Sequence, residues 1–290
     1  ILDDQGHPVD IKPYDRNPAT KIIEDFMLAA NETVAQDYFW QEIPFVYRTH
    51  EVPDTEKIKK LSTFINNCGY HIHMGSDEVH PKELQKLLAK IEDTPVEGLI
   101  SRLTLRSMKQ AKYSVECVGH FGLAAQYYCH FTSPIRRYPD LQIHRIIKDS
   151  LRGRMNEKRM EHYWKILPGV AQQASQLERR ADEAERETIK MKKVEYMESR
   201  IGNEYEGVIS GITNYGLYVE LPNTVEGMVH VTTLRGDYYN YIESTYEMVG
   251  ENTGKSYKLG QTVKIRVIGT DKLVRRIDFE LVDPKKEEEF

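Results

Sequence analysis

Two adjacent arginines, Arg136 and Arg137, stand in a polar segment directly before a predicted helix. The segment reads His-Phe-Thr-Ser-Pro-Ile-Arg-Arg-Tyr-Pro-Asp-Leu over residues 130–141, and Pro139 and Asp140 form the first turn of the helix. Guanidinium groups bind phosphate in a bidentate manner, and an anion is favoured at a helix N-terminus. The segment is therefore a candidate phosphate-binding loop. The residues also fit a plainer pattern, in which the arginines are surface charges and Asp140 is an ordinary acid of a first helical turn.

A second group of residues with binding chemistry lies near the C-terminal end of the chain. Tyr215 and Tyr218 stand at the start of one β-like run, and His230 lies on the next. Aromatic rings on neighbouring strands of a small barrel form a platform on which bases stack. Cationic side chains near such a platform hold phosphates, and the candidates are Lys264, Arg266, Arg275 and Arg276. Alternatively, both tyrosines are ordinary strand residues, one of them in the core.

Helical periodicity dominates the first 200 residues. It predicts helices over 19–39, 55–67, 81–91, a stretch from Pro95 through Arg106, 139–151 and 157–200. Pro168-Gly169 interrupts the last of these, so we expect two helices there or one kinked helix. Apolar or small residues recur at helical spacing, among them Ile22, Ile23 and Phe26 in the first helix and Leu177, Ala181, Ala184, Thr188 and Met191 in the last. Residues 45–50 resemble a short strand.

The pattern changes at Gly202 from helical to short β-runs. The runs are 208–209, 217–221, 228–231, 263–268 and 277–281, and several of the turns between them contain Gly, Pro or Asn. They predict a five-stranded barrel of the OB type. The chain is therefore expected to be α+β, with a mostly helical domain at 1–200, a barrel at 202–283 and the start of a charged tail at 284–290.

Bulk composition describes an ordinary globular protein, with a formal net charge of -5, 40% hydrophobic and 29% charged residues. Because the balance is slightly acidic, any nucleic-acid surface must be local. Neither a membrane-spanning stretch nor a secretory signal is visible in the sequence. Cys68, Cys117 and Cys129 follow no metal-ligand or disulfide spacing. We expect a cytoplasmic monomer with reduced thiols and no membrane contact.

Longer motifs extend these local patterns over essentially the whole chain. They include Gly119-His120-Phe121-Gly122-Leu123, the 130–138 segment and His144-Arg145, preceded by the segments 23–31, 47–53 and 108–114. Together they resemble the RNB (ribonuclease II) superfamily, and most of all its bacterial ribonuclease R branch. The segments around Gly207, Tyr215-Gly216-Leu217-Tyr218-Val219 and Glu226-Gly227-Met228-Val229-His230 resemble an S1 RNA-binding domain. The long tyrosine-rich loop at 237–258 is similar to the form of S1 domain in that branch.

The resemblance implies a fold and a function. The fold would be the C-terminal part of an RNB catalytic domain followed by an S1 barrel. The function would be that of a processive, hydrolytic 3′→5′ exoribonuclease, which degrades single-stranded RNA to nucleoside 5′-monophosphates. RNA 3′ ends are the expected partner, and the ribosome or RNA quality-control factors are further candidates.

The motif match also implies roles for individual residues. Arg136 matches an arginine that contacts the scissile phosphate and stabilises the charge developing on it. Glu185 matches an acid on a helix lining the RNA channel, which influences product release. Glu24, or its neighbour Asp25, matches an acid near the ribose of the terminal nucleotides. The other residues matched to RNA binding or its support are His130, Thr132, Ser133, Arg137, Tyr138, Tyr215, Tyr218, His230, Asp271 and one of Arg275 and Arg276. Of these two arginines we select Arg276 as the RNA-binding residue. Lys264 and Arg266 remain candidates for phosphate binding.

The family's reaction resembles a two-metal mechanism, in which Mg²⁺ ions need a tight set of carboxylates. In the family this set is an Asp-x-x-x-x-x-Asp-x-Asp-Asp cluster upstream of the segment where this chain begins, and the sequence contains no such cluster. Asp3-Asp4 is expected to be a turn, and Asp182 with Glu185 a solvated or arginine-paired face. His50, His71, His73 and His80 are expected to be structural. We therefore expect a C-terminal piece, without the family's cold-shock-type domains, that binds RNA but holds no Mg²⁺ and does not hydrolyse RNA alone.

Two other functions fit parts of the sequence. A non-catalytic RNA-binding or regulatory protein on an RNB scaffold would also lack the aspartate cluster. The sequence immediately upstream of Ile1 would separate this alternative from the enzyme, since an intact cluster there supports catalysis. A translation- or ribosome-associated S1 protein would explain residues 202–283 but not the long match over 1–200.

Overall fold

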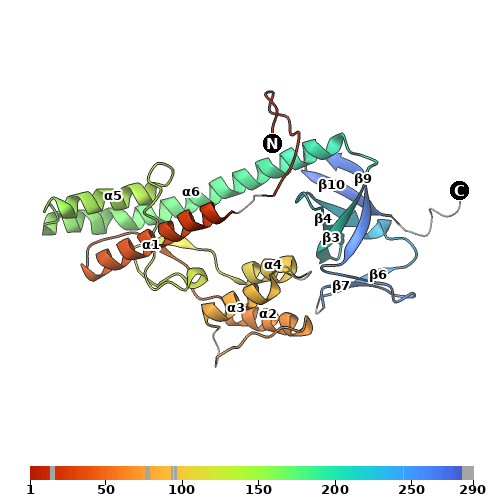
Figure 1. The fold of residues 1–290 in the computed structure, drawn as a ribbon, viewed down its shortest axis with the longest axis horizontal. Helices are drawn as coiled ribbons and strands as arrows, with labels where there is room; N and C mark the ends of the chain where they lie inside the picture. The colour runs from red at the N-terminus through yellow and green to blue at the C-terminus, as the bar shows by residue number, and fades with distance from the viewer. Residues whose placement is uncertain (14–16, 76–78, 93, 95–96, 244, 283–290) are drawn as a thin grey trace. The chain divides into compact units, whose positions relative to one another are not determined.

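The computed structural model describes residues 1–13, 17–75, 79–92, 94, 97–243 and 245–282 (Figure 1). The chain divides into two compact units. The helical unit comprises residues 15–92 and 100–182, and the barrel unit comprises residues 1–14, 93–99 and 183–290. The predicted tail at 284–290 lies outside the described residues.

Most of the helical unit consists of helices at the predicted positions. They are α1 (Pro18–Trp40), α2 (Thr55–Asn67), α3 (Pro81–Ile91), α4 (Glu97–Ser107), α5 (Tyr138–Leu151) and the first part of α6 (Glu157–Glu198). The side chains of Asn17 and Asp54 accept hydrogen bonds from backbone N–H groups in the first turns of α1 and α2. Such caps satisfy donors that a helix leaves unpaired, so they fix where the two helices begin.

A short antiparallel sheet connects these helices. It pairs β1 (Tyr47–Thr49), within the strand predicted at 45–50, with β2 (Lys112–Ser114), which was not predicted. Figure 1 shows α1 and α5 beside the first half of α6. Side chains from these helices and strands share one apolar core, which includes Phe45, Ile143, Ile146, Tyr163 and Leu167.

The structure decides between the alternatives left open at Pro168 and shows where the apolar residues of the helices lie. Pro168 does not divide α6 into two helices, since α6 is continuous from Glu157 to Glu198. Leu167 and Ala171, on either side of the proline, are buried in the core, and this packing offsets the backbone hydrogen bond that proline removes. The two apolar stripes are largely exposed: Phe26 is 71% and Leu177 53% exposed. In this part of α6 the buried face carries Ala171 and Ser175 instead.

The five predicted β-runs form a closed barrel in the barrel unit. Its strands are β3 (Glu204–Thr213), β4 (Gly216–Glu220), β5 (Glu226–His230), β9 (Thr262–Asp271) and β10 (Arg276–Leu281). The order is β10-β5-β4-β3-β9, and β9 pairs with β10 to close the ring. Neighbours are antiparallel except β10 and β5. Val194 and Met197 at the end of α6 belong to the barrel core, in agreement with the assignment of α6 from residue 183 onward to this unit.

The segment at 237–258 is not a long loop as expected. It forms a three-stranded antiparallel sheet of β6 (Tyr239–Ile242), β7 (Glu247–Gly250) and β8 (Ser256–Lys258). Met248 and Tyr257 are buried in the barrel core. Asp237 stabilises the sheet from outside the strands, because its carboxylate accepts hydrogen bonds from the backbone N–H groups of Asn252 and Thr253.

The structure also describes the state of the cysteines and the apolar content of the helices. Cys68, Cys117 and Cys129 are free thiols, and Cys129 is buried. Among the described residues, no helix combines the length and the apolar content that crossing a bilayer requires.

Candidate functional site

The segment 130–137, here called the Arg136 loop, is anchored at its start by α1 and α5. The Phe131 N–H donates to Asn31 Oδ1 at 3.0 Å, and the Phe131 carbonyl lies 2.9 Å from His144 Nε2. The Phe131 and His144 rings also stack, with centroids 4.5 Å apart. Asn31 is 1% exposed, and its amide donates to the Tyr128 hydroxyl. The start of the loop is therefore fixed by buried polar contacts.

The end of the loop is anchored by Asp140 in the first turn of α5. Asp140 is fully buried, and its Oδ1 accepts from the Ser133 N–H at 2.8 Å and from Arg137 Nη2 at 2.7 Å. The Arg137 N–H donates to the Ser133 carbonyl at 3.1 Å, which closes the turn from 133 to 137. Arg136 therefore projects from a turn that is held at both ends.

The two arginines have different surroundings. Arg136 is exposed beside the fully exposed Ile135, and within the described residues it makes no ion pair. The Arg137 side chain is only 14% exposed because it points inward to Asp140. The buried carboxylate therefore already binds the guanidinium of Arg137, and RNA binding by this residue stays a prediction. Only Arg136 of this pair is placed to meet a phosphate from solvent.

His130 lies inside a buried network and is not a surface ligand. Its Nδ1 is 2.9 Å from the Tyr113 hydroxyl, and Arg48 Nη1 donates to Glu178 Oε2 of α6 at 2.6 Å. The Arg48 guanidinium also lies over the Tyr113 ring, 4.7 Å from its centroid. Burial, reinforced by nearby arginines, lowers the pKa of His130 to about 3. His130 is therefore neutral near pH 7, as the prediction of a supporting role requires.

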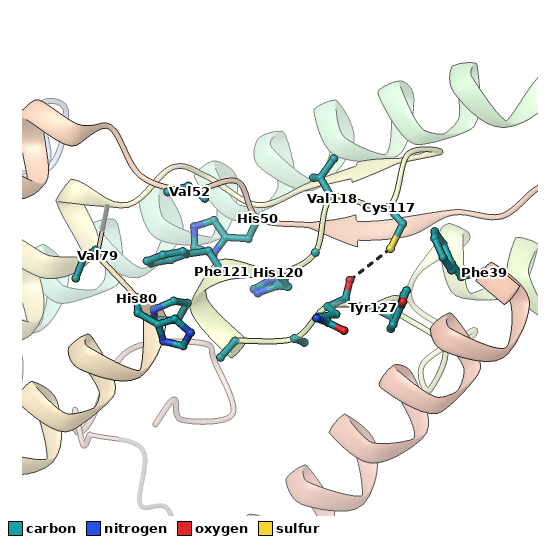
Figure 2. Close-up of a pocket in the computed structure, with 15 residues that line it drawn as sticks. Phe39, His50, Val52, Val79, His80, Cys117, Val118, His120, Phe121 and Tyr127 are labelled. Carbon is teal, nitrogen blue, oxygen red and sulfur yellow. Dashed lines mark hydrogen bonds between the residues drawn. The ribbon is translucent and has the colours of Figure 1, made fainter. Parts of the chain in front are cut away.

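Aromatic contacts continue from His130 to a pocket in the helical unit. The rings of Tyr128 and His130, of His120 and Tyr128, and of His50 and His120 have centroids 5.9, 5.2 and 5.0 Å apart. The pocket encloses about 680 Å³, and Figure 2 shows His50 and His120 beside Phe121 on one side with Phe39 and Tyr127 on the other. It contains none of the predicted catalytic or RNA-binding residues, and no charged side chain lines it. The pocket is therefore unsuited to phosphate.

Three further predicted residues, Glu24, Ser133 and Tyr138, belong to α1, to the loop and to the start of α5. Glu24 is half-buried and stands seven residues before Asn31, hence on the same face of α1, whereas Asp25 is exposed. The choice between these two acids for a contact with the ribose stays a prediction. Ser133 contributes its backbone to the turn, and the half-exposed Tyr138 accepts a hydrogen bond from Arg145 at 3.4 Å.

The barrel carries the predicted aromatic residues on its outer surface. Leu217 and Val219 point into the core, so Tyr218 between them points outward. His230 pairs in register with Gly216 and points outward from β5, since Val229 before it is buried. Tyr215, in the turn before β4, is 70% exposed. The three side chains are therefore arranged as a stacking platform requires, although binding itself stays a prediction.

The predicted phosphate-binding cations of the barrel all lie near carboxylates. Lys264 is 2.8 Å from Glu204, Arg266 is 3.0 Å from Glu280, and Arg276 is 3.0 Å from Asp278. Arg275 pairs with Glu187 of α6. Asp271 accepts the Leu273 and Val274 N–H groups and so shapes the hairpin turn between β9 and β10. Phosphate would have to compete with these half-buried acids, so the pairing weakens the case for Lys264, Arg266 and Arg276.

The described residues do not contain a metal cluster. Nowhere among them do three or more His, Cys, Asp or Glu side chains gather in a manner that could hold a metal ion. Asp3 accepts the Gln5 and His7 N–H groups, which confirms the turn predicted at Asp3-Asp4. Asp182 and Glu185 are both exposed on α6. Glu185 belongs to the barrel unit and Arg136 to the helical unit.

Sequence reasoning missed the residues that fix the loop. Asn31, Tyr113 and Glu178 come from three elements far apart in the sequence, and only folding brings them together. The motifs contained Asn31 and Tyr113 but gave no sign of their contacts. Asp140 was considered, but its burial was not foreseen.

Comparison with known proteins identifies two domain families in the chain. The RNB domain family matches residues 1–153, which is more than half of the chain, and the S1 RNA binding domain family matches residues 198–281. Ribonuclease R 1 of Lactococcus lactis is 44% identical over 280 residues, covering 97% of this chain and 34% of that protein. Ribonuclease R of Thermotoga maritima is 45% identical over 290 residues, covering 99% of this chain and 41% of that protein.

A solved structure extends the similarity to the fold. The structure of Mycoplasma genitalium RNase R in complex with ribose methylated single-stranded RNA superposes with a TM-score of 0.91 at 27% identity. The match covers 97% of this chain and 44% of that one. The chain thus spans less than half the length of these relatives. It belongs to the RNB family, is similar to the ribonuclease R proteins over nearly all of its length, and carries an S1 RNA binding domain.

Proposed function

We propose that the chain is part of a ribonuclease R-type enzyme, a processive hydrolytic exoribonuclease that degrades single-stranded RNA from its 3′ end to nucleoside 5′-monophosphates. One observation carries the proposal. Among the residues that the structure describes, Arg136 makes no ion pair and stands on a turn anchored at both ends, in a chain that resembles ribonuclease R over 97% or more of its length. The L. lactis and T. maritima relatives carry that name, and the M. genitalium relative has been solved with single-stranded RNA.

In this proposal Arg136 acts on the scissile phosphate. As the bond to the leaving nucleotide breaks, negative charge increases on the phosphate oxygens, and a guanidinium held in place stabilises it without reorganising. Glu24 is proposed to contact the ribose near the 3′ end, where the 2′-hydroxyl distinguishes RNA from DNA. Glu185 is proposed to affect product release along the RNA channel. Tyr215, Tyr218 and His230 would bind bases on the S1 barrel.

Mg²⁺ is proposed as the cofactor of the full-length enzyme, where it would activate water and stabilise the leaving oxygen. The carboxylates of the described residues do not fit a magnesium site, because no three of them gather in one place. We therefore assign the metal ligands to residues other than those described and derive no catalytic step through the metal. A cytoplasmic location and a monomeric state complete the proposal.

Product analysis of the full-length protein tests this function. Single-stranded RNA labelled at its 5′ end should shorten from the 3′ end in the presence of Mg²⁺, and nucleoside 5′-monophosphates should accumulate. Release of oligonucleotides, or loss of the 5′ label in the first turnovers, would contradict the proposal. Tight binding without any cleavage would favour a non-catalytic RNA-binding protein on the same scaffold.

A further inference from the structure

The carboxylate of Asp140 lies in the interior of the Arg136 loop. Its Oδ1 accepts hydrogen bonds from the Ser133 N–H and from Arg137 Nη2, at 2.8 and 2.7 Å. These two partners stand on either side of Arg136 in the sequence. One carboxylate oxygen therefore connects both ends of the turn that presents Arg136.

This arrangement differs from that of an ordinary acid in a first helical turn. Such an acid faces solvent and interacts mainly with the helix dipole. Asp140 is fully buried, and a buried charge is costly unless it is paired and hydrogen-bonded. The side chain of Arg137, the residue before α5, makes no capping bond to the helix and turns back to Asp140. The pair is thus part of the loop interior and not a weak surface ion pair.

Several other polar side-chain atoms in and beside the Ser133–Arg137 turn give it no additional support. Within the described structure, Thr132 Oγ1, Arg137 Nε and Asp140 Oδ2 are buried without a hydrogen-bond partner. A buried polar group without a partner is unfavourable for folding. The shape of the turn therefore depends strongly on the two bonds to Asp140 Oδ1 and on the backbone bond from Arg137 to Ser133.

We propose that Asp140 is a positioning residue, which fixes the Ser133–Arg137 turn and thereby aims Arg136 at the phosphate without itself touching RNA. The inference rests on the proposed function, since the task of Arg136 belongs to that function. Fixed placement matters because a charged donor accelerates a reaction only when it is already at the correct position in the transition state.

A set of variants of the full-length protein tests the proposal. Asp140→Ala should lower the single-turnover cleavage rate about tenfold with RNA affinity retained, and Asp140→Asn should restore part of the rate. Asp149→Ala is the matched control, because Asp149 also lies on α5 and accepts from Arg159, at 2.7 Å, but away from the loop. It should leave the rate unchanged.

Double substitution shows whether Asp140 acts through Arg136. In an Arg136→Ala background, Asp140→Ala should cause no further loss of rate, because the group being positioned is already absent. A full and independent loss in that background would overturn the proposal. So would a wild-type rate for Asp140→Ala.

Hydrogen exchange provides a measurement that does not depend on cleavage. The peptide containing the Ser133 amide should exchange about tenfold faster in Asp140→Ala and at the wild-type rate in Asp149→Ala. Unchanged exchange in Asp140→Ala would overturn the proposal, even if the full-length protein proves inactive and the proposed function fails. If Asp140→Ala does not fold, Asp140→Asn carries both measurements, with smaller changes of the same sign.

Discussion

At the scale of single residues, the environment of a guanidinium determines what it can contribute to catalysis. The Arg137 charge is neutralised by a buried carboxylate at 2.7 Å, so it is not available to a substrate. The Arg136 charge is exposed, but its backbone belongs to a turn fixed by Asn31, Ser133 and Asp140. A free charge on a fixed backbone is suited to stabilise a transition state, because it loses little freedom when the phosphate charge develops.

Arg136→Ala in the full-length protein should therefore affect turnover far more than binding. We expect kcat to fall about a hundredfold or more, because the interaction is made chiefly in the transition state. Arg152→Ala, which removes an exposed arginine at the other end of α5, is the control and should behave as wild type. Weaker RNA binding with unchanged kcat in Arg136→Ala would contradict the assignment.

Replacing Tyr215 and Tyr218 together by alanine should have the opposite effect. Each base stacked on an aromatic ring contributes about 1–3 kcal/mol, so the Kd for single-stranded RNA should rise about tenfold or more. The cleavage rate at saturating RNA should stay near that of the wild type. Phenylalanine at both positions should restore affinity, since it retains the stacking surface. Fluorescence anisotropy measures the Kd. An unchanged Kd of the double alanine variant would show that Tyr215 and Tyr218 do not form a base-stacking platform.

The sequence predicted the identity of Arg136 but not its environment. Two neighbouring arginines before a helix are equivalent by composition and spacing, and only the fold reveals that Asp140 takes one of them. Tyr218 and His230 were predictable as outward residues, because alternation along a strand follows from the sequence. The carboxylates that pair with Lys264, Arg266 and Arg276 were not foreseen, since they come from cross-strand contacts and one local pair.

At the scale of secondary-structure elements, buried histidines connect the Arg136 loop with its neighbours. His50, His120 and His130 are packed among Tyr113, Tyr128 and Phe121. Burial lowers the pKa of His120 to about 4 and that of His130 to about 3, and it also lowers the pKa of His50. The folded structure therefore keeps these imidazoles neutral where exposed ones would take a proton.

The helical unit should consequently lose stability on acidification. Unfolded histidines bind protons near pH 6.5, whereas His120 and His130 in the folded state bind them only near pH 4 and 3. Between these values the unfolded state holds more protons, so stability falls as pH decreases, by at most about 1.4 kcal/mol per pH unit for each histidine. Thermal unfolding at several pH values measures the slope.

A variant separates this effect from general acid sensitivity. His130→Asn should make the decrease in melting temperature shallower, whereas His162→Asn should not, because His162 is exposed. Equal slopes for the wild type and His130→Asn would show that the burial of His130 has no such consequence.

Gly216 allows a stability prediction for the barrel. Its φ is +148°, and a Cβ there would lie 2.0 Å from the Val229 carbonyl oxygen. Because that obstacle is backbone, Gly216→Ala should destabilise the barrel by about 3 kcal/mol. Gly269→Ala is the control, since its Cβ would meet only Asp278 Oδ2, at 3.9 Å. Denaturant unfolding gives both values, and similar values for the two variants would contradict the steric argument.

The elements differ in how far the sequence predicted them. Capped helices such as α2 and α3 have the expected bounds, because their start signals are local. The residues of β6 to β8 were expected to form a loop, because these strands are short. The hydrogen bonds by which Asp237 stabilises the sheet join residues 15 and 16 positions apart, and a local sequence pattern does not reveal such contacts. The continuity of α6 through Pro168 also depends on tertiary packing, which a local rule cannot supply.

At the scale of the whole molecule, the net charge of -5 of these 290 residues argues against a general electrostatic attraction of this chain to RNA. Binding must come from local features, and we assign it to the Arg136 loop in one unit and to the aromatic platform in the other. The carboxylates for Mg²⁺ are assigned elsewhere, because the described residues gather no metal cluster. The central claim is therefore our proposal that the described residues provide RNA binding and the phosphate-contacting arginine, and that the metal ligands lie outside them.

The most direct test compares the 1–290 polypeptide with the full-length protein on the same labelled single-stranded poly(A) with Mg²⁺. The account predicts that both bind the RNA, that the full-length protein shortens it from the 3′ end, and that the 1–290 polypeptide leaves it intact. Degradation by the purified 1–290 polypeptide, or the absence of degradation by the full-length protein, would contradict the central claim.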